Sequence, residues 1–257
     1  MSKKVKYIFV TGGVISGLGK GIVSASIGKL IQSINPSINI GIQKLDGYMS
    51  SSGASLLNPM EHGETFVLED GFEGDLDFGT YERFLNKSCE KDHSMTSGSI
   101  FKELLFKEER GDFLGSTVQV IPHLTGFIRE KWQDLVDKFN YDCLIIEIGG
   151  TVGDLESQWF VEAARELISK VKKEDILFVH LGFIPEIGQE EYQKTKPFQQ
   201  SLQLLKEKGI FPDILIGRCK NKLTEKTKQK LSWLCNVPLD CIFSDPDLEF
   251  SYELPLF

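Results

Sequence analysis

The sequence predicts an α/β fold in which helices cover both faces of a mostly parallel, doubly wound sheet. Apolar runs typical of strands alternate along the chain with segments of helical periodicity, which is the pattern of repeated strand–helix units. Several runs are almost continuously apolar, as expected for strands that are buried on both faces. A glycine-rich stretch follows the first run and opens the first helical segment, as in nucleotide-binding folds of this class.

The expected elements are read in order from these two patterns. The strands are short apolar runs, and they lie at residues 5–12, 38–46, 116–121, 143–150, 175–181, 213–219 and 240–244. The helices carry apolar residues at helical spacing, and they lie at residues 20–33, 123–137, 158–172, 196–208 and 225–234. Residues 47–116 break this rhythm and are expected to form a long, irregular stretch that is either functional or mobile. Because no linker or repeat interrupts the chain, we expect residues 1–257 to form a single domain.

Composition limits the classes of function. The 257 residues carry 29 lysines and arginines against 37 aspartates and glutamates, a formal net charge of −8, so a broad basic surface for nucleic acid is not expected. No apolar run approaches the length of a membrane span, and the short apolar run after the N-terminus reads as a strand. The five cysteines are odd in number and never form a C-x-x-C pair, which favours a reducing, cytoplasmic environment over disulfides or zinc.

Residues 10–22, "VTGGVISGLGKGI", have the composition of a phosphate-binding loop. Glycines let the backbone approach phosphate oxygens, the N–H groups at a helix start attract anions, and Lys20 would bridge phosphates. The usual P-loop ends in a serine or threonine that holds Mg²⁺, but here Gly21 follows the lysine and the spacing from Gly13 to Gly19 is one residue longer. The metal therefore needs ligands from elsewhere in the chain.

Two carboxylates are candidates for that task. Glu147 ends the apolar run "CLIIE", which places it at the carboxyl end of a predicted strand, where open α/β sheets hold their ligands. Asp77 lies in the acidic stretch "EGDLDFGTYERF", whose composition alone would favour a solvated loop. Mg²⁺ commonly takes one or two protein carboxylates and completes its shell with phosphate and water.

Two other segments could contact an anionic ligand. In "GGTVGDLES", Asp154 and Glu156 lie near a helix start, where they are either simple caps or ligand contacts. In "QKTKPFQQ", Lys194 and Lys196 precede a helix whose dipole they oppose, so they are either solvated or compensated by a triphosphate. His62 is either a proton carrier or a hydrogen-bonded loop residue.

Taken together, the motifs resemble the synthase (amidoligase) domain of the CTP synthases. They occur in the family's order and cover nearly the whole chain. The matching stretches are "YIFVTGGVISGLGKGI", "KLD", "HGETFVLEDG", "DLDFGTYERF", "RGDFLGSTVQVIPH", "EIGGTVGDLES", "KTKP", "PDILIGR", "LCNVP" and, more loosely, "DLEFSYELP".

The resemblance implies a P-loop NTPase-like fold, similar to that of dethiobiotin synthetase, and a ligase reaction. ATP would phosphorylate the 4-oxygen of UTP, and ammonia would displace that phosphate to give CTP, which in this family is also a feedback inhibitor. Phosphorylation makes physical sense because a carbonyl oxygen is a poor leaving group. The resemblance further implies Mg²⁺, a homotetramer or homodimer, and a glutaminase domain that supplies ammonia in the full-length protein.

The resemblance also assigns residues. Catalytic roles fall to Lys20, which would contact the phosphates, to Lys44, which would stabilise the transferring phosphoryl group, and to His62, beside the ammonia route. Asp77 and Glu147 match the Mg²⁺ ligands. The positions that match ATP contacts are Gly17, Leu18, Gly19, Lys20, Gly21, Ile22, Asp77, Asp247 and Leu248. The positions that match UTP and CTP contacts are Ser16, Asp154, Leu155, Glu156, Lys194, Thr195, Lys196, Pro197, Phe198, Gln199 and Lys230.

Three departures from the family pattern stand out. The loop after Asp46 reads "GYMSSS" where the family has proline and an acidic residue, and it is one residue longer, which bears on local ligand contacts and subunit packing. Phe198 stands where a small polar residue is usual, and Leu234 where an aromatic residue is common. The sequence ends at Phe257 with no match to the glutaminase domain, so we expect an isolated domain or a shortened homologue that uses free ammonia.

Two alternatives stay open. The altered loop at residues 47–58 would suit a nucleotide-binding regulatory or assembly homologue with weakened or no turnover. The long glycine loop is also shared with dethiobiotin-synthetase-like ligases, although "GGTVGDLES" and "KTKP" favour a pyrimidine nucleotide.

Overall fold

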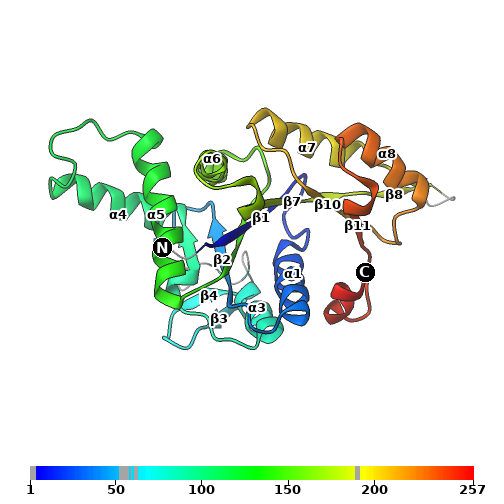
Figure 1. Cartoon of the computed structure of the whole chain (residues 1–257), viewed down its shortest axis with the longest axis horizontal. Coiled ribbons are helices and arrows are strands. Elements are labelled where there is room, and N and C mark those ends of the chain that lie inside the picture. The colour runs from blue at the N-terminus through cyan, green and yellow to red at the C-terminus, as the bar shows by residue number, and fades with distance from the viewer. Residues whose placement is uncertain (1–3, 52–57, 59, 61–62, 189–191) are drawn as a thin grey trace.

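The central sheet of the computed structural model is parallel throughout and has the strand order β11-β10-β7-β1-β6-β2-β5 (Figure 1). The structure describes residues 4–51, 58, 60, 63–188 and 192–257. The strands of the sheet are β1 (Lys6–Gly12), β2 (Ile40–Asp46), β5 (Ser94–Thr96), β6 (Cys143–Ile148), β7 (Ile176–Phe183), β10 (Ile214–Arg218) and β11 (Ile242–Asp245). Two small antiparallel pairs lie outside it, β3 (Thr65–Val67) with β4 (Glu73–Asp75), and β8 (Glu186–Ile187) with β9 (Tyr192–Gln193).

Helices cover both faces of the sheet, as the sequence predicts (Figure 1). One face packs against α1 (Lys20–Ile34), α3 (Asp77–Leu85) and the C-terminal 3-10 turn (Ser251–Leu256). The other face packs against α4 (Ser97–Glu109), α5 (Thr125–Phe139), α6 (Gln158–Ile168), α7 (Lys196–Glu207) and α8 (Glu225–Cys235). In the described part of the chain, no helix is long and apolar enough to cross a membrane. The parallel sheet with helices on both faces confirms the predicted α/β class.

Successive side chains of each strand point to opposite faces of the sheet, so the sheet contributes to the hydrophobic cores on both of its sides. On β1, the side chain of Phe9 is buried between Trp132 of α5 and Phe178 of β7, with ring centroids 5.2 and 5.1 Å away. Its neighbours Ile8 and Val10 point to the opposite face and pack in the cluster beneath α1. Every residue of β6 is buried, which accounts for the unbroken apolar run that predicts this strand.

Two predictions about residues 47–121 are wrong. The run at 116–121 is not a strand, because its residues other than the half-buried Val118 are exposed and lead into a distorted turn with a cis bond at Ile121–Pro122. Proline lacks the N–H that a central ladder needs. The stretch before it is also less irregular than expected, because it contains α3, α4 and the edge strand β5. β5 has only three residues and α3 only nine, so both carry little periodic signal, whereas α4 is a regular helix of 13 residues.

The strand order places the functional loops together. The chain leaves β1 toward β2 on one side and later returns to β7 on the other side. The carboxyl ends of β1, β2, β6 and β7 therefore meet at one edge of the sheet, on either side of the turn that follows β1. In open α/β sheets, this switch point is where ligands bind.

Candidate active site

The glycine-rich loop joins the end of β1 at Gly12 to the start of α1 at Lys20. Gly17 and Gly19 have φ angles of 70° and 102°, which residues with a side chain rarely adopt, so these two positions require glycine. In the described part of the chain, no side chain caps the start of α1. Its first N–H groups, together with the positive end of the helix dipole, therefore form an anion site at the edge of the sheet.

Lys20 crosses from this loop to the loop after β6. Its side chain is buried, and its Nζ donates a hydrogen bond to the carbonyl oxygen of Gly150 at 2.8 Å. Burial lowers the pKa of Lys20, while the charge of Glu147 opposes that effect. A second backbone hydrogen bond, from Val152 N to Gly12 O at 2.8 Å, holds the same two loops together. The lysine is thus fixed over the anion site.

The contact between Gly21 and Asp77 explains why the loop lacks a hydroxyl residue. A β-carbon built on Gly21 would lie 2.3 Å from Oδ1 and 2.5 Å from Cγ of Asp77. Such distances are impossible for real atoms, so the carboxylate at the start of α3 fills the volume that a serine or threonine side chain would need. The oxygen at this position comes from residue 77, and glycine at residue 21 makes room for it.

Lys44 forms the centre of a cluster of charges. Its Nζ lies 2.6 Å from Oδ2 of Asp77, 3.5 Å from Oε1 of Glu147 and 3.7 Å from Oδ1 of Asp46. Burial alone would lower the pKa of Lys44, but Asp46, Glu147 and Asp77 together raise it well above its ordinary value. The lysine is therefore a permanent cation held among three carboxylates that come from three separate segments.

Glu147 and Asp46 are buried carboxylates that depend on this lysine. Burial raises the pKa of both groups, and Lys44 opposes the rise in each case. Tyr81 donates a hydrogen bond to Oε2 of Glu147 and is itself buried, which raises the pKa of its hydroxyl well above the ordinary value. The hydroxyl of Tyr48 donates to Oδ2 of Asp46 at 3.0 Å.

The cluster fits a magnesium ion that is shared with a phosphate ligand. Asp77 and Glu147 supply carboxylate oxygens, the donors that Mg²⁺ prefers, and both approach one point that a cation, Nζ of Lys44, already occupies. Among the described residues, no group of three or more His, Cys, Asp or Glu side chains is arranged to hold a metal by itself. Two carboxylates with phosphate oxygens and water would meet the needs of the ion.

The predicted pyrimidine-nucleotide residues surround the same loops. Thr195 is buried just before α7, and Lys194 and Lys196 are exposed beside it. A β-carbon built on Gly13 would lie 2.0 Å from Cβ of Ser201, so α7 presses directly against the phosphate loop. The first turn of α7 and the anion site are therefore parts of one surface. Pro197 and Gln199 belong to this turn, and Nε2 of Gln199 donates to Oγ1 of Thr195 at 2.7 Å.

The other residues that are predicted to contact UTP and CTP are buried, form a turn or are exposed. The side chain of Phe198 is fully buried against Gly182 and the ring of His180, so only its backbone could meet a ligand. Asp154 accepts hydrogen bonds from the amide and the hydroxyl of Thr151, as a turn-forming residue does. Lys230 is exposed on α8, where no described contact joins it to the loops. The remaining predicted positions, Ser16, Leu155 and Glu156, are exposed.

Gly47 accounts for one departure from the family pattern. A β-carbon built on Gly47 would lie 2.9 Å from Cβ and 3.2 Å from the carbonyl oxygen of Glu156. The absence of a side chain at residue 47 lets the loop after β2 approach the 149–157 segment closely. Residues 52–57, 59 and 61–62, which include the predicted catalytic residue His62, lie outside the described residues.

A pocket of about 420 Å³ extends from the phosphate loop to the ends of β7 and β10. Gly17 and Leu18 line it on one side and Arg218 and Asp247 on the other, and these last two form an ion pair of 2.6 Å. Leu248 and Ile22 are partly buried in the cluster beneath α1. Of the predicted ATP contacts, Gly17, Leu18 and Asp247 thus line one cavity.

A buried hydrogen-bonded chain connects β1 to α7 behind the phosphate loop. His180 lies 3.0 Å through Nδ1 from Oγ1 of Thr11 and 2.9 Å through Nε2 from Oγ of Ser201. Burial, with a smaller effect of Lys20, lowers the pKa of His180 to about 3, so the ring is neutral at physiological pH. The residue before the glycine loop and the helix with the KTKP segment therefore share one rigid support.

Sequence reasoning missed several members of the site. Tyr81 follows Asp77 by four residues on a helix, and Asp46 follows Lys44 by two on a strand, so helical and strand periodicity could have indicated both. Asp245 has no such signal. It is buried at the end of β11, and its Oδ2 lies 3.5 Å from a β-carbon built on Gly19 and finds no hydrogen-bond partner among the described residues.

Known proteins resemble the chain over nearly its whole length. Residues 6–257 match the family model described as the CTP synthase N-terminus. CTP synthases from Thermosynechococcus vestitus and Pyrococcus abyssi are 47% and 46% identical over 98% of this chain, which spans 46% of each relative. A third, from Halobacterium salinarum, is 44% identical over 98% of this chain and 44% of its own length. The chain thus spans about half the length of the curated relatives it matches.

Among solved structures, FtsY from Mycoplasma mycoides has a TM-score of 0.41 and 10% identity, with 93% of this chain and 59% of that one covered. This likeness is too distant to carry an argument about the site.

Proposed function

This chain belongs to the family of the CTP synthase N-terminus, and we propose that it catalyses the ATP-dependent amination of UTP to CTP with ammonia as the nitrogen donor. The observation that carries this proposal is the cluster at the end of the sheet. Lys44 lies 2.6 Å from Asp77 and 3.5 Å from Glu147, beside the anion site that begins at Lys20. Cations and candidate metal ligands there surround one point, which is what phosphoryl transfer requires.

The reaction would proceed in two balanced steps. The 4-oxygen of UTP attacks the γ-phosphorus of ATP, the uracil N3 loses its proton to solvent, the bond between the γ-phosphorus and the bridging oxygen breaks, and ADP leaves. Ammonia then attacks carbon 4 of the phosphorylated pyrimidine, loses a proton to solvent, and inorganic phosphate leaves with the former carbonyl oxygen. Each step needs alignment and charge neutralisation more than covalent help from the protein.

The residues of the chain would divide this work. The N–H groups at the start of α1 and Lys20 would hold the phosphates of ATP, and Lys44 would stabilise the charge on the transferring phosphoryl group. Asp77 and Glu147 would hold Mg²⁺, which when bound neutralises charge on the phosphates. The first turn of α7, with Lys194 and Lys196, would take the triphosphate of UTP or of CTP acting as inhibitor.

The site supports turnover more than the alternative of a regulatory or assembly homologue. Lys20, Lys44, Asp77 and Glu147 are all present and brought together. A non-catalytic homologue would bind nucleotides without needing buried carboxylates around a lysine, a costly arrangement in a protein interior.

The test is an assay with ATP, UTP, Mg²⁺ and ammonium chloride. CTP and ADP should form in equal amounts, and Lys44→Met should lower kcat by at least about 100-fold, the effect of removing one preorganised charge. Lys29→Met, on the exposed side of α1, is the matched control and should retain activity. A folded sample that binds both nucleotides but forms no CTP would contradict the proposal and favour the regulatory alternative.

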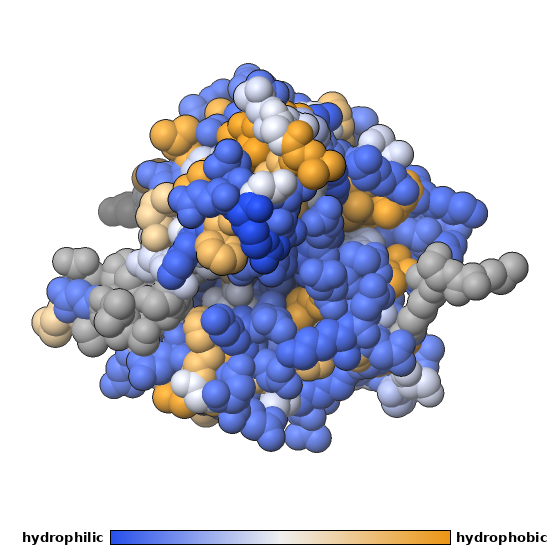
Figure 2. Space-filling model, turned by 90° about the vertical axis from the view of Figure 1, so that its left-hand side faces the viewer, coloured by the Kyte–Doolittle hydropathy of each residue, from blue (hydrophilic) through white to orange (hydrophobic). Residues whose placement is uncertain are grey.

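We further propose that the chain self-associates through the arm formed by the end of α4, the turns after it and the start of α5. This arm extends from one end of the molecule (Figure 1). It exposes the large apolar side chains of Leu105, Phe106, Leu114, Val120 and Ile121. Figure 2 faces this end and shows apolar residues on an otherwise largely hydrophilic surface. Grouped exposed apolar residues are typical of protein–protein contacts, and a homodimer or homotetramer would cover them.

A further inference from the structure

Strands β8 and β9 bring the KTKP segment to the site, although neither strand belongs to the central sheet. Glu186 of β8 lies opposite Gln193 of β9, and Lys194 follows directly. The N–H of Lys194 donates to the carbonyl oxygen of Pro185 at 2.8 Å, so the strand pair also fixes the backbone of the lysine. A single pair of strands is marginally stable at best by itself. The position of Lys194 therefore depends on what holds β8 and β9 to the rest of the molecule.

The side-chain amide of Gln193 joins the strand pair to the start of α8. Its Nε2 donates to Oε1 of Glu186 at 3.2 Å and to the carbonyl oxygen of Lys222 at 3.0 Å, and its Oε1 accepts from the N–H of Thr224 at 3.0 Å. Thr224 is the N-cap residue of α8. Because a carbonyl only accepts and a backbone N–H only donates, these partners fix the orientation of the amide.

The carboxylate of Glu186 holds the same loop through another residue. Its Oε1 accepts from the backbone N–H of Asn221 at 3.0 Å, and its Oε2 accepts from Nδ2 of Asn221 at 2.7 Å. Burial acts to raise the pKa of Glu186, but hydrogen bonds from Asn221 and Gln193 outweigh it and lower the pKa below its ordinary value. Hydrogen bonds to such a charged acceptor are stronger than those between neutral groups. Glu186 and Gln193, which we call the clamp, thus fasten β8 and β9 to residues 221–224.

The clamp lies between the two proposed nucleotide sites. Pro185 and Glu186 line the pocket of about 420 Å³ that also contains predicted ATP contacts. Lys194, the residue after the clamp, begins the segment that is proposed to take the triphosphate of UTP. Figure 1 shows β8 beside α8, away from the arm, and in the sheet order β7 lies on the other side of β1 from β6 and β2. A change in the clamp can therefore reach a UTP contact while the cluster around Lys44 stays intact.

The clamp also brings two cations to one aromatic ring. Because β9 is held against the start of α8, Nζ of Lys194 and Nζ of Lys226 lie 5.0 and 5.7 Å from the ring centroid of Tyr192. Each ammonium group is attracted by the ring, and all three side chains are exposed. Two positive charges in one exposed place attract anions from solvent. A triphosphate would meet this charge only while Lys194 is held in place.

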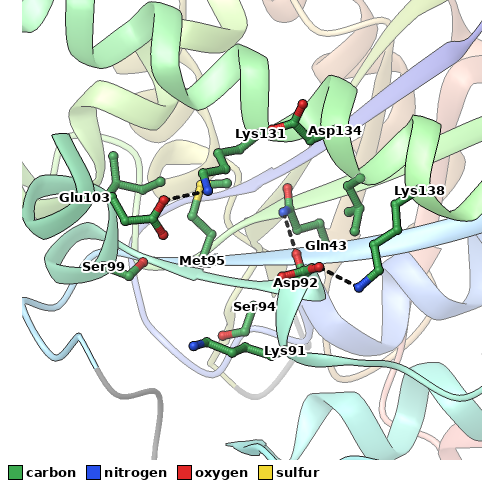
Figure 3. A pocket seen from close by; sticks show the side chains of 12 residues that line it. Gln43, Lys91, Asp92, Ser94, Met95, Ser99, Glu103, Lys131, Asp134 and Lys138 are labelled. Atoms are coloured by element: carbon green, nitrogen blue, oxygen red, sulfur yellow. Dashed lines mark hydrogen bonds and ion pairs between the residues drawn. The ribbon is translucent and has the colours of Figure 1, made fainter. Parts of the chain in front are cut away.

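Paired charges elsewhere in the described chain do not have this relation to a nucleotide site. A pocket of about 290 Å³ lies between β5, α4 and α5, and Figure 3 shows Lys131 pairing with Glu103 and Lys138 with Asp92 there, at 2.5 and 2.8 Å. No predicted nucleotide contact lines this pocket, which adjoins the edge strand at the opposite end of the sheet order. Pairing alone therefore assigns no function, and the clamp is informative because of the segment that it holds.

We propose that Glu186 and Gln193 are positioning residues, which hold Lys194 for the triphosphate of UTP or CTP without touching that nucleotide themselves. This inference rests on the proposed function of the site. Loss of the clamp should weaken the binding of pyrimidine nucleotides and leave the chemical step unchanged. KM rises alone when a variant loses an interaction that the ground state and the transition state share.

The test combines isothermal titration of UTP without ATP and steady-state kinetics of CTP formation. Glu186→Ala should raise the Kd and the KM of UTP about tenfold or more, with kcat nearly unchanged. The direction is diagnostic, because removing a carboxylate near a triphosphate should by charge alone strengthen binding. Gln193→Leu changes no charge and should give the same result. The double variant should bind little more weakly than either single variant, because the two residues act as one unit.

A matched control lies at the far end of α7. Nε2 of Gln203 donates to Oε1 of Glu207 at 3.2 Å, the same contact as in the clamp but between exposed residues. Glu207→Ala and Gln203→Leu should leave the affinity for UTP unchanged. The clamp residues are half-buried and lie outside the hydrophobic clusters, so their variants should fold.

Hydrogen exchange gives a measurement that needs no nucleotide. In the unliganded protein, the amide of Lys194 should exchange faster in both clamp variants than in the wild type and in the controls. The proposal is wrong if both clamp variants bind UTP as the wild type does, if kcat falls while KM stays the same, or if this amide keeps its wild-type exchange rate. A wild type that binds no UTP would overturn the proposed function as well, whereas unaffected variants of a chain that forms CTP would overturn this inference alone.

Discussion

Single residues shape the site both through their functional groups and, where a side chain is missing, through the volume that a neighbouring residue can fill. Gly21 has no side chain to offer, yet the position of Asp77 depends on it, because any β-carbon there would collide with the carboxylate. Asp245 shows the reverse case, a carboxylate buried beside Gly19 whose Oδ2 has no hydrogen-bond partner among the described residues. Both features can be examined with small substitutions.

Gly21→Ala should displace Asp77 and leave the helix intact. Alanine is a better helix former than glycine, so any loss comes from the collision with Asp77 and not from helix propensity. We expect Mg²⁺-dependent CTP formation to fall by at least about 100-fold, measured with a magnesium titration. Gly126→Ala is the control, because the nearest atom to its new β-carbon is 3.8 Å away in the side chain of Arg129. Full activity in Gly21→Ala would contradict the assignment of Asp77.

Asp245→Asn should stabilise the chain at neutral pH. Burial, with a smaller contribution from Asp247, raises the pKa of Asp245 to about 6 from its ordinary 3.8, while Arg218 opposes the rise. Between these two values the folded state binds more protons than the unfolded state, so the free energy of unfolding falls as the pH rises. Asparagine removes this penalty, which is at most about 3 kcal/mol. Urea denaturation without nucleotide at pH 4 and pH 7.5 measures it.

The increase in the free energy of unfolding of Asp245→Asn should appear at pH 7.5 and be nearly absent at pH 4. Asp240→Asn, an exposed carboxyl in the turn before β11, is the control and should change neither value. An Asp245→Asn variant that is equally stabilised at both pH values would contradict the role given to its charge.

At the scale of elements, the site depends on how strands and helices are held against one another. The KTKP segment leads into α7, and the phosphate loop forms the turn between β1 and α1. The two segments are far apart in sequence. The close contact of Gly13 with Ser201 and the hydrogen bonds of His180 join them. A displacement of α7 would therefore reach the phosphate loop directly.

His180→Phe tests the hydrogen bonds that join α7 to the strand before the phosphate loop. The ring is kept, but both hydrogen bonds are lost, and Thr11 and Ser201 fall back on the carbonyl oxygens of Val179 and Phe198 at 3.2 and 3.0 Å. Because the pKa of His180 is about 3 in the folded state and 6.5 ordinarily, the unfolded state binds more protons between these values. The wild type thus loses stability through this group as the pH falls below 6.5, by about 2 kcal/mol at pH 5.

The titrations of His180 and Asp245 change the free energy of unfolding in opposite directions as the pH rises, so the two variants can be compared directly. Compared with the wild type, His180→Phe should be relatively more stable at pH 5 than at pH 7, and Asp245→Asn should be relatively more stable at pH 7 than at pH 5. Urea denaturation at both pH values checks the signs. If both variants shift in the same direction, one of the two assignments is wrong.

For the whole molecule, the parallel sheet brings residues from distant segments to one edge, and the arm of α4 and α5 extends away from it (Figure 1). Replacing Phe106 and Leu114 of the arm by serine should reduce self-association, because both side chains are exposed and apolar. Sedimentation velocity should show the equilibrium shifted toward monomer by at least about tenfold in the dissociation constant. Trp233→Ser, which removes an exposed apolar residue of α8, should leave the equilibrium unchanged.

The sequence predicts the central strands and the helices beside them because their apolar runs are long and regular. It fails for β5 and the segment at 116–121, since three residues at a sheet edge carry little periodic signal and Pro122 ends an apolar run that never joins the sheet. Glu147 is foreseeable as a carboxylate at a strand end, whereas Lys44 is indicated only by the family resemblance. The volume shared by Gly21 and Asp77 is not foreseeable, because it exists only after α3 has packed against α1.

That shared volume also makes positions 21 and 77 a reciprocal pair for protein engineering. Only one of them can place atoms in the gap, so a serine at 21 becomes tolerable when the carboxylate at 77 is deleted, and neither change is harmless alone. A designer who wishes to graft the common hydroxyl-bearing loop onto this scaffold would have to exchange both positions at once. The oxygen proposed to bind the metal would then belong to the phosphate loop, and this contact would no longer constrain the sequence of α3.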